Sequence, residues 1–203
     1  MYIVGIDEAG RGPWAGPLFV ALTVINYENL YRFIELGVDD SKKLSAKKRD
    51  KLFEFIVSNV DYYSVLSADV DLIDKLGVYK TTKKLIQDLV FELPIKYMFD
   101  SKIKIDGVFD SLDLKSRCIN SHIDFECIID GDMKEVCISA ASIVAKVLRD
   151  REMIRLASLY PQYGFDKHKG YGTKSHIEAL KKYGVSPVHR KSFKPIQKFL
   201  AFF

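Results

Sequence analysis

The sequence has few cysteines, no long apolar run and no common phosphate-binding motif. Three cysteines, Cys118, Cys127 and Cys137, are spread without a CxxC pair. This pattern excludes a disulfide framework or a cysteine zinc site and indicates reduced, packed thiols. The apolar runs are too short to span a membrane, and residues 1–6 are too few to form a signal peptide. We therefore expect a cytoplasmic protein without a membrane partner. The lack of a P-loop argues against a phosphotransferase.

Length and charge suggest one domain with a basic end. The sequence has 203 residues, 48% hydrophobic and 29% charged, which is ordinary for a globular protein and fits one domain over residues 1–203. Net charge is only +4, yet residues 167–198 contain nine Lys or Arg and a single acid, Glu178. Such a run is usually a solvated helix face. The alternative is a surface that binds nucleic-acid phosphates.

Apolar patterns divide the chain into strands and helices. Short apolar runs predict strands at residues 1–6, 18–25, 61–68, 102–109 and 123–129. Helical spacing predicts helices at 46–60 after the cap residue Ser45, at 85–93 before Pro94, at 137–159 and at 175–183, with a loop over 160–173. This order indicates an α/β layered domain with a basic helical C-terminal lobe at about 160–203.

Acidic residues follow several of the predicted strands. Asp7 and Glu8 come directly after the first strand, and Asp106 and Asp132 follow later apolar stretches. Adjacent carboxylates at a buried strand end are costly unless positive charge neutralises them. Side chains alternate along a strand, so Asp7 and Glu8 would diverge if the strand continued. We expect the glycine-rich turn that follows to bring Glu8 back towards Asp7.

Four such carboxylates are the ligands that a pair of hard divalent cations needs. Magnesium prefers oxygen ligands and keeps water or substrate phosphate in its shell. Two ions about 4 Å apart can activate a water and stabilise the leaving oxygen of a phosphodiester. Four solvated strand ends remain the alternative from these residues alone.

Longer motifs resemble one known family. In chain order they are DEAGRGPWAGP at 7–17, DSKKLS at 40–45, IDG at 105–107, GD at 131–132, ISAASIVAKVLRD at 138–150 and HKGYGT at 168–173. Together they resemble ribonuclease HII and cover nearly the whole chain. A lone acidic pair is weak evidence, but the glycine turn, the SAASIVAK segment and the GYGT loop make the combination specific.

The resemblance implies both a fold and a reaction. The fold would be RNase H-like, a central mixed sheet flanked by helices. Asp7, Glu8, Asp106 and Asp132 would hold two Mg²⁺ or Mn²⁺ ions, with Asp7 bridging both. The substrates would be RNA–DNA hybrids and duplex DNA containing ribonucleotides. The family cuts on the 5′ side of the ribonucleotide and leaves a 3′-hydroxyl and a 5′-phosphate.

Five further residues are predicted to bind the substrate. Glycines allow close backbone approach, so peptide groups of Gly10 and Gly12 can reach the 2′-hydroxyl that distinguishes RNA from DNA. Arg11 can hold an adjacent phosphate with its fork of donors. The resemblance implies that Tyr171 stacks on the sugar and that Lys42 contacts backbone phosphate. A loop anchor at Tyr171 and a solvated charge at Lys42 are the alternatives.

Some assignments stay open in the sequence. Asp110 also follows an apolar pair and competes with Asp106 for the third carboxylate position, although Asp106 precedes a glycine as the family pattern requires. Lys146 and Asp150 lie four residues apart, which favours a helix salt bridge or a supporting role near the metals. Trp14 replaces a smaller residue of the family, and we expect it to change packing only.

The tail allows two interpretations. Residues 197–202 loosely resemble peptides that bind a DNA sliding clamp, whereas Ile196, Phe199, Leu200 and Phe203 are spaced as a core-facing helix stripe, which we favour. We expect a monomer.

Two other functions compete with the leading one. A DNA nuclease or resolvase on the same fold would cut all-DNA duplex. A nucleic-acid binding module without catalysis would explain the basic end, but carboxylates near phosphate weaken binding unless metals intervene.

Overall fold

The computed structural model describes residues 1–39, 41–98, 101–109, 112 and 124–200. The strands are β1 Tyr2–Ala9, β2 Leu18–Asn26, β3 Tyr62–Ala68, β4 Ser101–Asp106 and β5 Asp124–Ile128. The α-helices are α1 Leu30–Glu35, α2 Ala46–Asn59, α3 Val70–Leu76, α4 Val78–Glu92, α5 Ile95–Met98, α6 Val136–Leu159, α7 Phe165–His168, α8 Lys174–Tyr183 and α9 Lys194–Leu200. Short 3₁₀ turns are η1 Tyr27–Asn29, η2 Gly131–Met133 and η3 Pro161–Tyr163.

The strands form a mixed sheet in the order β3-β2-β1-β4-β5. β2 runs antiparallel to both β1 and β3, whereas β1, β4 and β5 run parallel to one another. The carboxyl ends of these three parallel strands therefore meet at one edge of the sheet, where a crevice for ligands commonly forms.

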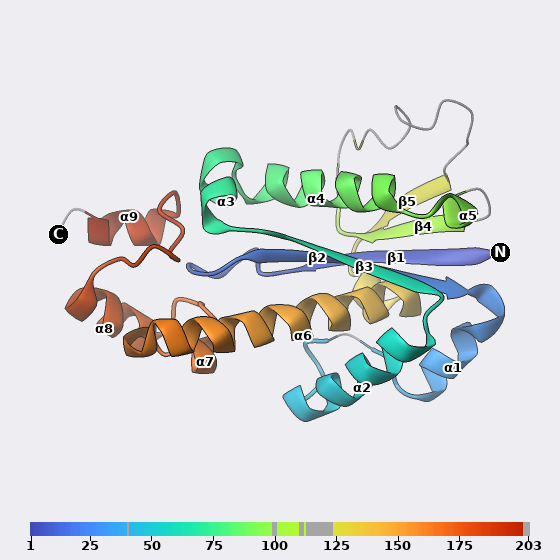
Figure 1. Ribbon diagram of the computed structural model, residues 1–203, viewed down its shortest axis with the longest axis horizontal. Helices are drawn as coiled ribbons and strands as arrows, with labels where there is room; N and C mark the ends of the chain where they lie inside the picture. The colour runs from blue at the N-terminus through green and yellow to red at the C-terminus, as the bar shows by residue number, and fades with distance from the viewer. Residues whose placement is uncertain (40, 99–100, 110–111, 113–123, 201–203) are drawn as a thin grey trace.

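Helices cover both faces of the sheet (Figure 1). Val4, Ile6 and Leu22 pack with residues of α3 and α4 on one face. Ile3 and Ala21, from the same two strands, pack with α1, α2 and α6 on the other. Both faces of the central strands are thus buried, which explains why their sequences are nearly continuous apolar runs.

The long helix α6 lies unusually close to β1. Gly5 permits this, because a β-carbon there would collide with the backbone carbonyl of Cys137. The same carbonyl accepts a hydrogen bond from Thr23 Oγ1 at 3.0 Å, which ties the start of α6 to β2. These contacts hold α6, which carries Ser142 and Lys146, against the sheet.

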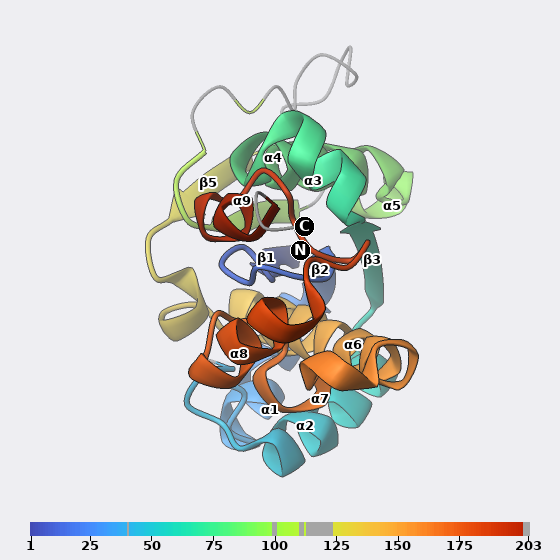
Figure 2. The ribbon, with the colours of Figure 1, turned by 90° about the vertical axis from the view of Figure 1, so that its left-hand side faces the viewer.

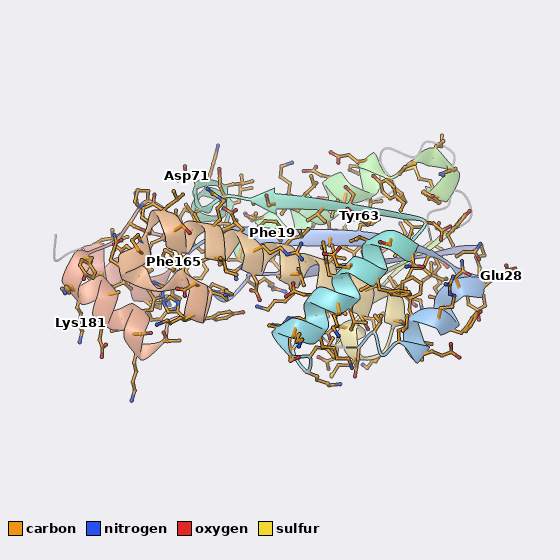
Figure 3. All side chains as sticks on the ribbon, turned by 60° about the horizontal axis from the view of Figure 1, so that its bottom comes forward. Phe19, Glu28, Tyr63, Asp71, Phe165 and Lys181 are labelled. Atoms are coloured by element: carbon orange, nitrogen blue, oxygen red, sulfur yellow. The ribbon has the colours of Figure 1, made fainter. Side chains whose placement is uncertain are left out.

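The C-terminal elements gather at one end of the molecule (Figures 1 and 2). Their own apolar cluster contains Phe165, Leu180 and Ile196, together with Met153 from the end of α6 and Ala15 from the turn after β1. Figure 3 places Lys181 at this end and Glu28 at the opposite one. The helical C-terminal region thus packs directly on the glycine-rich turn.

The structure confirms the expected α/β fold and most of the expected elements. Strand β4 is shorter than predicted, because it ends at Asp106 and Gly107 follows with a positive φ of 90°. The expected loop at 160–173 contains η3 and α7. Helices α1, α3 and α5 were not predicted; each has seven residues or fewer, too few for a clear periodic pattern.

Among the helices that the structure describes, none combines the length and apolar character that a membrane crossing requires.

Candidate active site

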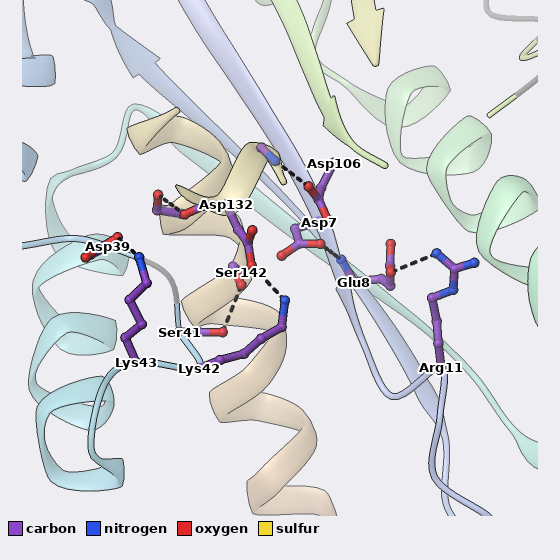
Figure 4. Close-up of polar contacts among 12 residues, drawn as sticks. Asp7, Glu8, Arg11, Asp39, Ser41, Lys42, Lys43, Asp106, Asp132 and Ser142 are labelled. Atoms are coloured by element: carbon purple, nitrogen blue, oxygen red, sulfur yellow. Dashed lines mark hydrogen bonds and ion pairs between the residues drawn. The ribbon is translucent and has the colours of Figure 1, made fainter. Parts of the chain in front are cut away.

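Four acidic residues lie at the carboxyl edge of the parallel strands. Asp7 and Glu8 are among the last three residues of β1, and Asp106 is the last residue of β4. Asp132 lies in η2, which follows β5. Figure 4 shows their side chains side by side. Residues separated by more than a hundred positions are brought together because the parallel connections return each strand in the same direction.

The path of β1 corrects one prediction. The strand continues through Glu8 to Ala9, so no turn brings Glu8 back towards Asp7. Instead, the pairing of β1 with β4 stops at Ile6–Ile105, and β4 itself ends one residue later at Asp106. Asp7 and Glu8 alternate across the strand as geometry requires. Both line one cavity at this end of the two strands.

This cavity has a volume of about 180 Å³ and contains most of the residues predicted for the site. From those predictions it includes Asp7, Glu8, Gly10, Arg11, Gly12, Lys42, Asp106 and Tyr171. Asp132 does not line it directly. Its carboxylate Oδ2 accepts a hydrogen bond from Lys42 Nζ at 2.9 Å. Because Lys42 lines the cavity, this bond connects Asp132 to the cavity wall.

Three of these carboxyl groups, on Asp7, Glu8 and Asp106, have raised pKa values. Burial raises the pKa of Asp7 well above its usual range, and the negative charges of Glu8 and Asp106 raise it further, while a hydrogen bond from Ser142 lowers it. Burial also raises the pKa values of Glu8 and Asp106. Asp106 Oδ1 accepts a hydrogen bond from Gly131 N at 2.7 Å, which partly offsets this effect. Clustered acids held this way are typical of functional sites.

Two exposed cations partly balance these acids. Lys42 extends into solvent with 75% of its side chain exposed, and its ammonium pairs with the buried Asp132. Arg11 Nη1 lies 3.3 Å from Glu8 Oε1, with the arginine side chain 45% exposed. Asp7 forms no ion pair with any residue that the structure describes. Ion pairs this open to water contribute little to stability. With them in place, the pKa values of Asp7, Glu8 and Asp106 are still raised, mainly by burial.

The donor set suits hard divalent cations, because all four side chains offer only carboxylate oxygens. As the side chains stand, the described residues contain no group of three or more His, Cys, Asp or Glu closed around one metal position. Asp106 points to a backbone amide, Glu8 to Arg11 and Asp132 to Lys42. Each of these bonds engages one carboxylate oxygen, so an ion could bind the second oxygen or replace Arg11 and Lys42 as the partner.

Two glycine-containing loops face each other across the cavity. Gly10 has a φ of +106°, which L side chains rarely adopt, and a β-carbon there would collide with the side chain of Arg149. A β-carbon on Gly12 would lie only 3.6 Å from the ring of Tyr171. Tyr171 itself is 47% exposed. The glycine loop and the Tyr171 ring are thus neighbours in the wall of the same cavity.

Comparisons with known proteins identify the family. The family model for ribonuclease HII matches residues 4–196. The chain belongs to the ribonuclease HII family. A ribonuclease HII of Coxiella burnetii is 42% identical over 202 residues, which cover all of this chain and 93% of that protein. The crystal structure of ribonuclease H2 from Pyrococcus horikoshii superimposes with a TM-score of 0.85 at 31% identity, over 100% of this chain and 98% of that one.

A second solved structure is the ribonuclease HII of Archaeoglobus fulgidus in complex with PCNA. It matches with a TM-score of 0.80 at 29% identity, and both chains are covered completely. The protein is accordingly a ribonuclease H, an endonuclease of the family that degrades the RNA of RNA–DNA hybrids and uses divalent metal ions.

Sequence analysis missed two arginines that support this ribonuclease HII site. Arg149 and Arg190 are both completely buried and hydrogen-bond to the loop at 10–17. Arg190 belongs to the basic run at 167–198 but is buried, so it is not part of a basic surface, whereas the lysines around it are mostly exposed. An arginine in a basic run gives no sequence signal of burial. For Arg149, its position four residues after Ala145 and four before Met153, in line with the apolar positions of the helix, was the available hint.

The remaining predictions have mixed outcomes. Lys146 Nζ and Asp150 Oδ1 form the expected helix ion pair at 2.7 Å, and Lys146 also lines the cavity. Cys127 and Cys137 are free thiols. The ring of Trp14 packs on Gly172, next to Tyr171, which is the packing role expected of it. Asp110 and Cys118 lie outside the described residues.

Proposed function

We propose that this chain cuts on the 5′ side of a ribonucleotide, both in RNA–DNA hybrids and at single ribonucleotides embedded in duplex DNA. The products would carry 3′-hydroxyl and 5′-phosphate ends. One observation carries the proposal: carboxylates, the glycine turn at 10–12 and Tyr171 share one cavity. Acids suited to phosphodiester hydrolysis thus lie beside groups suited to recognising a ribose.

The acidic side chains would hold two Mg²⁺ or Mn²⁺ ions. We assign Asp7 as the ligand shared by both ions, and Glu8, Asp106 and Asp132 as ligands to one ion or its waters. Such ions would supply an activated water and stabilise the leaving oxygen. The repulsion among buried carboxylates supports this assignment, because a cation would relieve it.

The residues around the acids would bind the nucleic acid. Backbone groups of Gly10 and Gly12 would contact the 2′-hydroxyl, and Tyr171 would stack on the sugar from the opposite side. Arg11 would hold an adjacent phosphate. Lys42 would exchange its partner Asp132 for phosphate when the metal is bound, which its exposure makes feasible.

We treat residues 1–203 as one ribonuclease HII domain that acts as a monomer. The exposed lysines of the C-terminal region, among them Lys174, Lys181, Lys182 and Lys198, would track the duplex backbone beyond the cut. This electrostatic contact is independent of sequence and would add affinity without selectivity.

A sliding clamp is a further candidate partner. The relative from Archaeoglobus fulgidus was solved with PCNA, and the tail of this chain loosely resembles clamp-binding peptides. Ile196 is buried and Phe199 packs on the C-terminal cluster, as the stripe prediction required, but Leu200 is 42% exposed; residues 201–203 lie outside the described residues. Deleting residues 197–203 would abolish clamp capture in a pull-down if the tail is the contact, and unchanged capture would rule the tail out.

The decisive experiment uses one duplex that carries a single ribonucleotide, with the cut position mapped in Mg²⁺, in Mn²⁺ and with a chelator. We expect one cut, 5′ of the ribonucleotide, that depends on the metal. An all-DNA duplex of the same sequence should stay intact.

The other outcomes identify the competing functions. Efficient cutting of the all-DNA duplex would indicate a DNA nuclease. Binding of the duplex without metal-dependent turnover would indicate a binding module.

A further inference from the structure

Two buried arginines lie beneath the glycine loop without a carboxylate partner among the described residues. Arg149 and Arg190 are 1% and 0% exposed. A buried cation is costly unless its donors are satisfied. Here the acceptors are backbone carbonyls, and most of them belong to residues 11–17, the segment that follows the catalytic acids.

Arg190 holds both ends of this segment. Its Nε and Nη2 donate to the Gly16 carbonyl at 3.0 and 2.8 Å, and Nη2 also reaches the Pro17 carbonyl at 3.3 Å. Its Nη1 donates to the Arg11 carbonyl at 3.1 Å. One planar guanidinium therefore clamps peptide groups five residues apart in a fixed relative orientation.

The bond to the Arg11 carbonyl has a direct consequence for the cavity. The C=O and N–H of a trans peptide point in opposite directions, and no described peptide bond is cis. With the Arg11 carbonyl turned towards Arg190, the N–H of Gly12 points away from Arg190. Gly12 lines the cavity next to Tyr171, so its amide is a backbone donor in the cavity wall on the side of the peptide away from Arg190.

Arg149 joins this loop to the one that carries Tyr171. Its Nε donates to the Pro17 carbonyl at 3.1 Å, and its Nη2 donates to the carbonyls of Ala15 and Lys169 at 3.3 and 3.1 Å. A single side chain thus bridges the two loops that line the cavity. Trp14 N adds a backbone link to the Gly170 carbonyl at 2.8 Å.

We propose that Arg149 and Arg190 are positioning residues for ribose recognition: Arg190 orients the Gly12 amide, and Arg149 fixes the spacing between that amide and Tyr171. The inference rests on the proposed function and extends it to two residues that act through the backbone of the loop. The selectivity for a 2′-hydroxyl is set by these carbonyl contacts, because loops of irregular backbone hold their shape only where their polar groups are paired.

The test measures binding rather than turnover. In an Asp7→Asn background, affinity is compared for two duplexes of one sequence, one with a single ribonucleotide and one all DNA. Arg149→Lys and Arg190→Lys keep the charge but lose the fork. Each should lower the preference for the ribonucleotide duplex about tenfold, as expected if one hydrogen bond to the 2′-hydroxyl is lost. Affinity for the all-DNA duplex should not change.

Arg155→Lys is the matched control, since Arg155 lies on the same helix as Arg149 but is 60% exposed and pairs with Glu152. It should keep the full preference. In the enzyme with Asp7 restored, the two buried-arginine variants should lose on the order of 100-fold in kcat, as expected for a small misplacement of reacting groups, with a smaller change in KM.

If a lysine variant fails to fold, Phe193→Leu provides the second route. The guanidinium of Arg190 lies 5.2 Å from the Phe193 ring centre, so this change loosens Arg190 while keeping both arginines. It should cause a milder loss of the same preference. An unchanged preference in folded variants would overturn the inference, leaving both arginines purely structural. A parent protein that shows no preference at all would refute the proposed function instead.

Discussion

Two regions of this molecule bury charge, and they do so in opposite ways. At the carboxyl edge of the sheet, Asp7, Glu8 and Asp106 lie close together and burial raises the pKa of each. Beneath the glycine loop, Arg149 and Arg190 are buried at least as deeply, but every hydrogen bond that they donate ends on a backbone carbonyl.

The difference suggests different roles: the acidic cluster suits the binding of cations, and the two arginines stabilise the shape of a loop. Carboxylates left to repel one another keep a standing attraction for cations, because binding a cation removes the repulsion. The hydrogen bonds of the two arginines end on backbone carbonyls, and these side chains therefore hold the loop in place. The predictions below test this contrast, from the largest expected effect to the smallest.

Asp7→Asn should have the largest effect. Cleavage of a hybrid should fall on the order of 1000-fold or more, because transition-state stabilisation worth several kcal/mol is lost. Folding should persist, as judged by circular dichroism. With chelator at neutral pH, the urea midpoint should rise, since a buried carboxylate with a raised pKa destabilises the native state once ionised.

The raised pKa of Asp7 also predicts how the stability of the protein changes with pH. The native state binds the Asp7 proton more tightly than the unfolded chain, so the stability of the parent protein in chelator falls as pH rises from the usual Asp range through the raised pKa. Asp7→Asn should flatten that fall. An unchanged pH profile would contradict the claim that the cluster is repulsive.

Arg190→Met should mainly reduce stability. Carbonyls at residues 11, 16 and 17 would lose a charged donor, and the free energy of unfolding should fall on the order of 3 kcal/mol, as for one or two lost charge-assisted bonds. Urea unfolding measures this. Arg155→Met, a change on the exposed face of α6, should leave the midpoint nearly unchanged. Equal effects would show that Arg190 is no anchor.

Lys42→Ala should weaken substrate use moderately. We expect kcat/KM for a hybrid to fall about tenfold and the log–log dependence of binding on salt to lose about one unit of slope, the signature of one phosphate contact. Lys43→Ala is the matched control, because Lys43 pairs with the exposed Asp39 on the same loop. Similar losses in both variants would show that Lys42 contributes only as part of the general surface charge and makes no specific phosphate contact.

The histidine pair of the C-terminal region should give the smallest effect. His176 Nε2 and His189 Nε2 lie 3.0 Å apart, and burial lowers their pKa values to about 4 and about 3. The unfolded chain therefore binds more protons between about pH 4 and pH 6.5, and stability should fall as pH drops through that window. Measured in the Asp7→Asn background, His189→Gln should flatten this fall. A slope that stays steep would assign it to other groups.

Particular residues show how far sequence reasoning reached. The cap at Ser45, which accepts a hydrogen bond from Lys48 N, and the stop before Pro94 were predictable because local rules govern them. The placement of Glu8 was not. Whether β1 ended at Ile6 or at Ala9 depended on pairing with β2, which continues to Ala9–Phe19 and is a contact between segments.

The sequence by itself determined the family, the α/β order of elements and the identity of the acidic side chains, because motifs and periodicity are local properties of the chain. Only the tertiary structure decided that the pairing of β1 with β4 stops at Ile6–Ile105 while β1 continues to Ala9, that Lys42 pairs with Asp132, and that Arg190 turns inward. Each of these depends on which distant backbone groups need a partner, and that requirement exists only once the chain has packed.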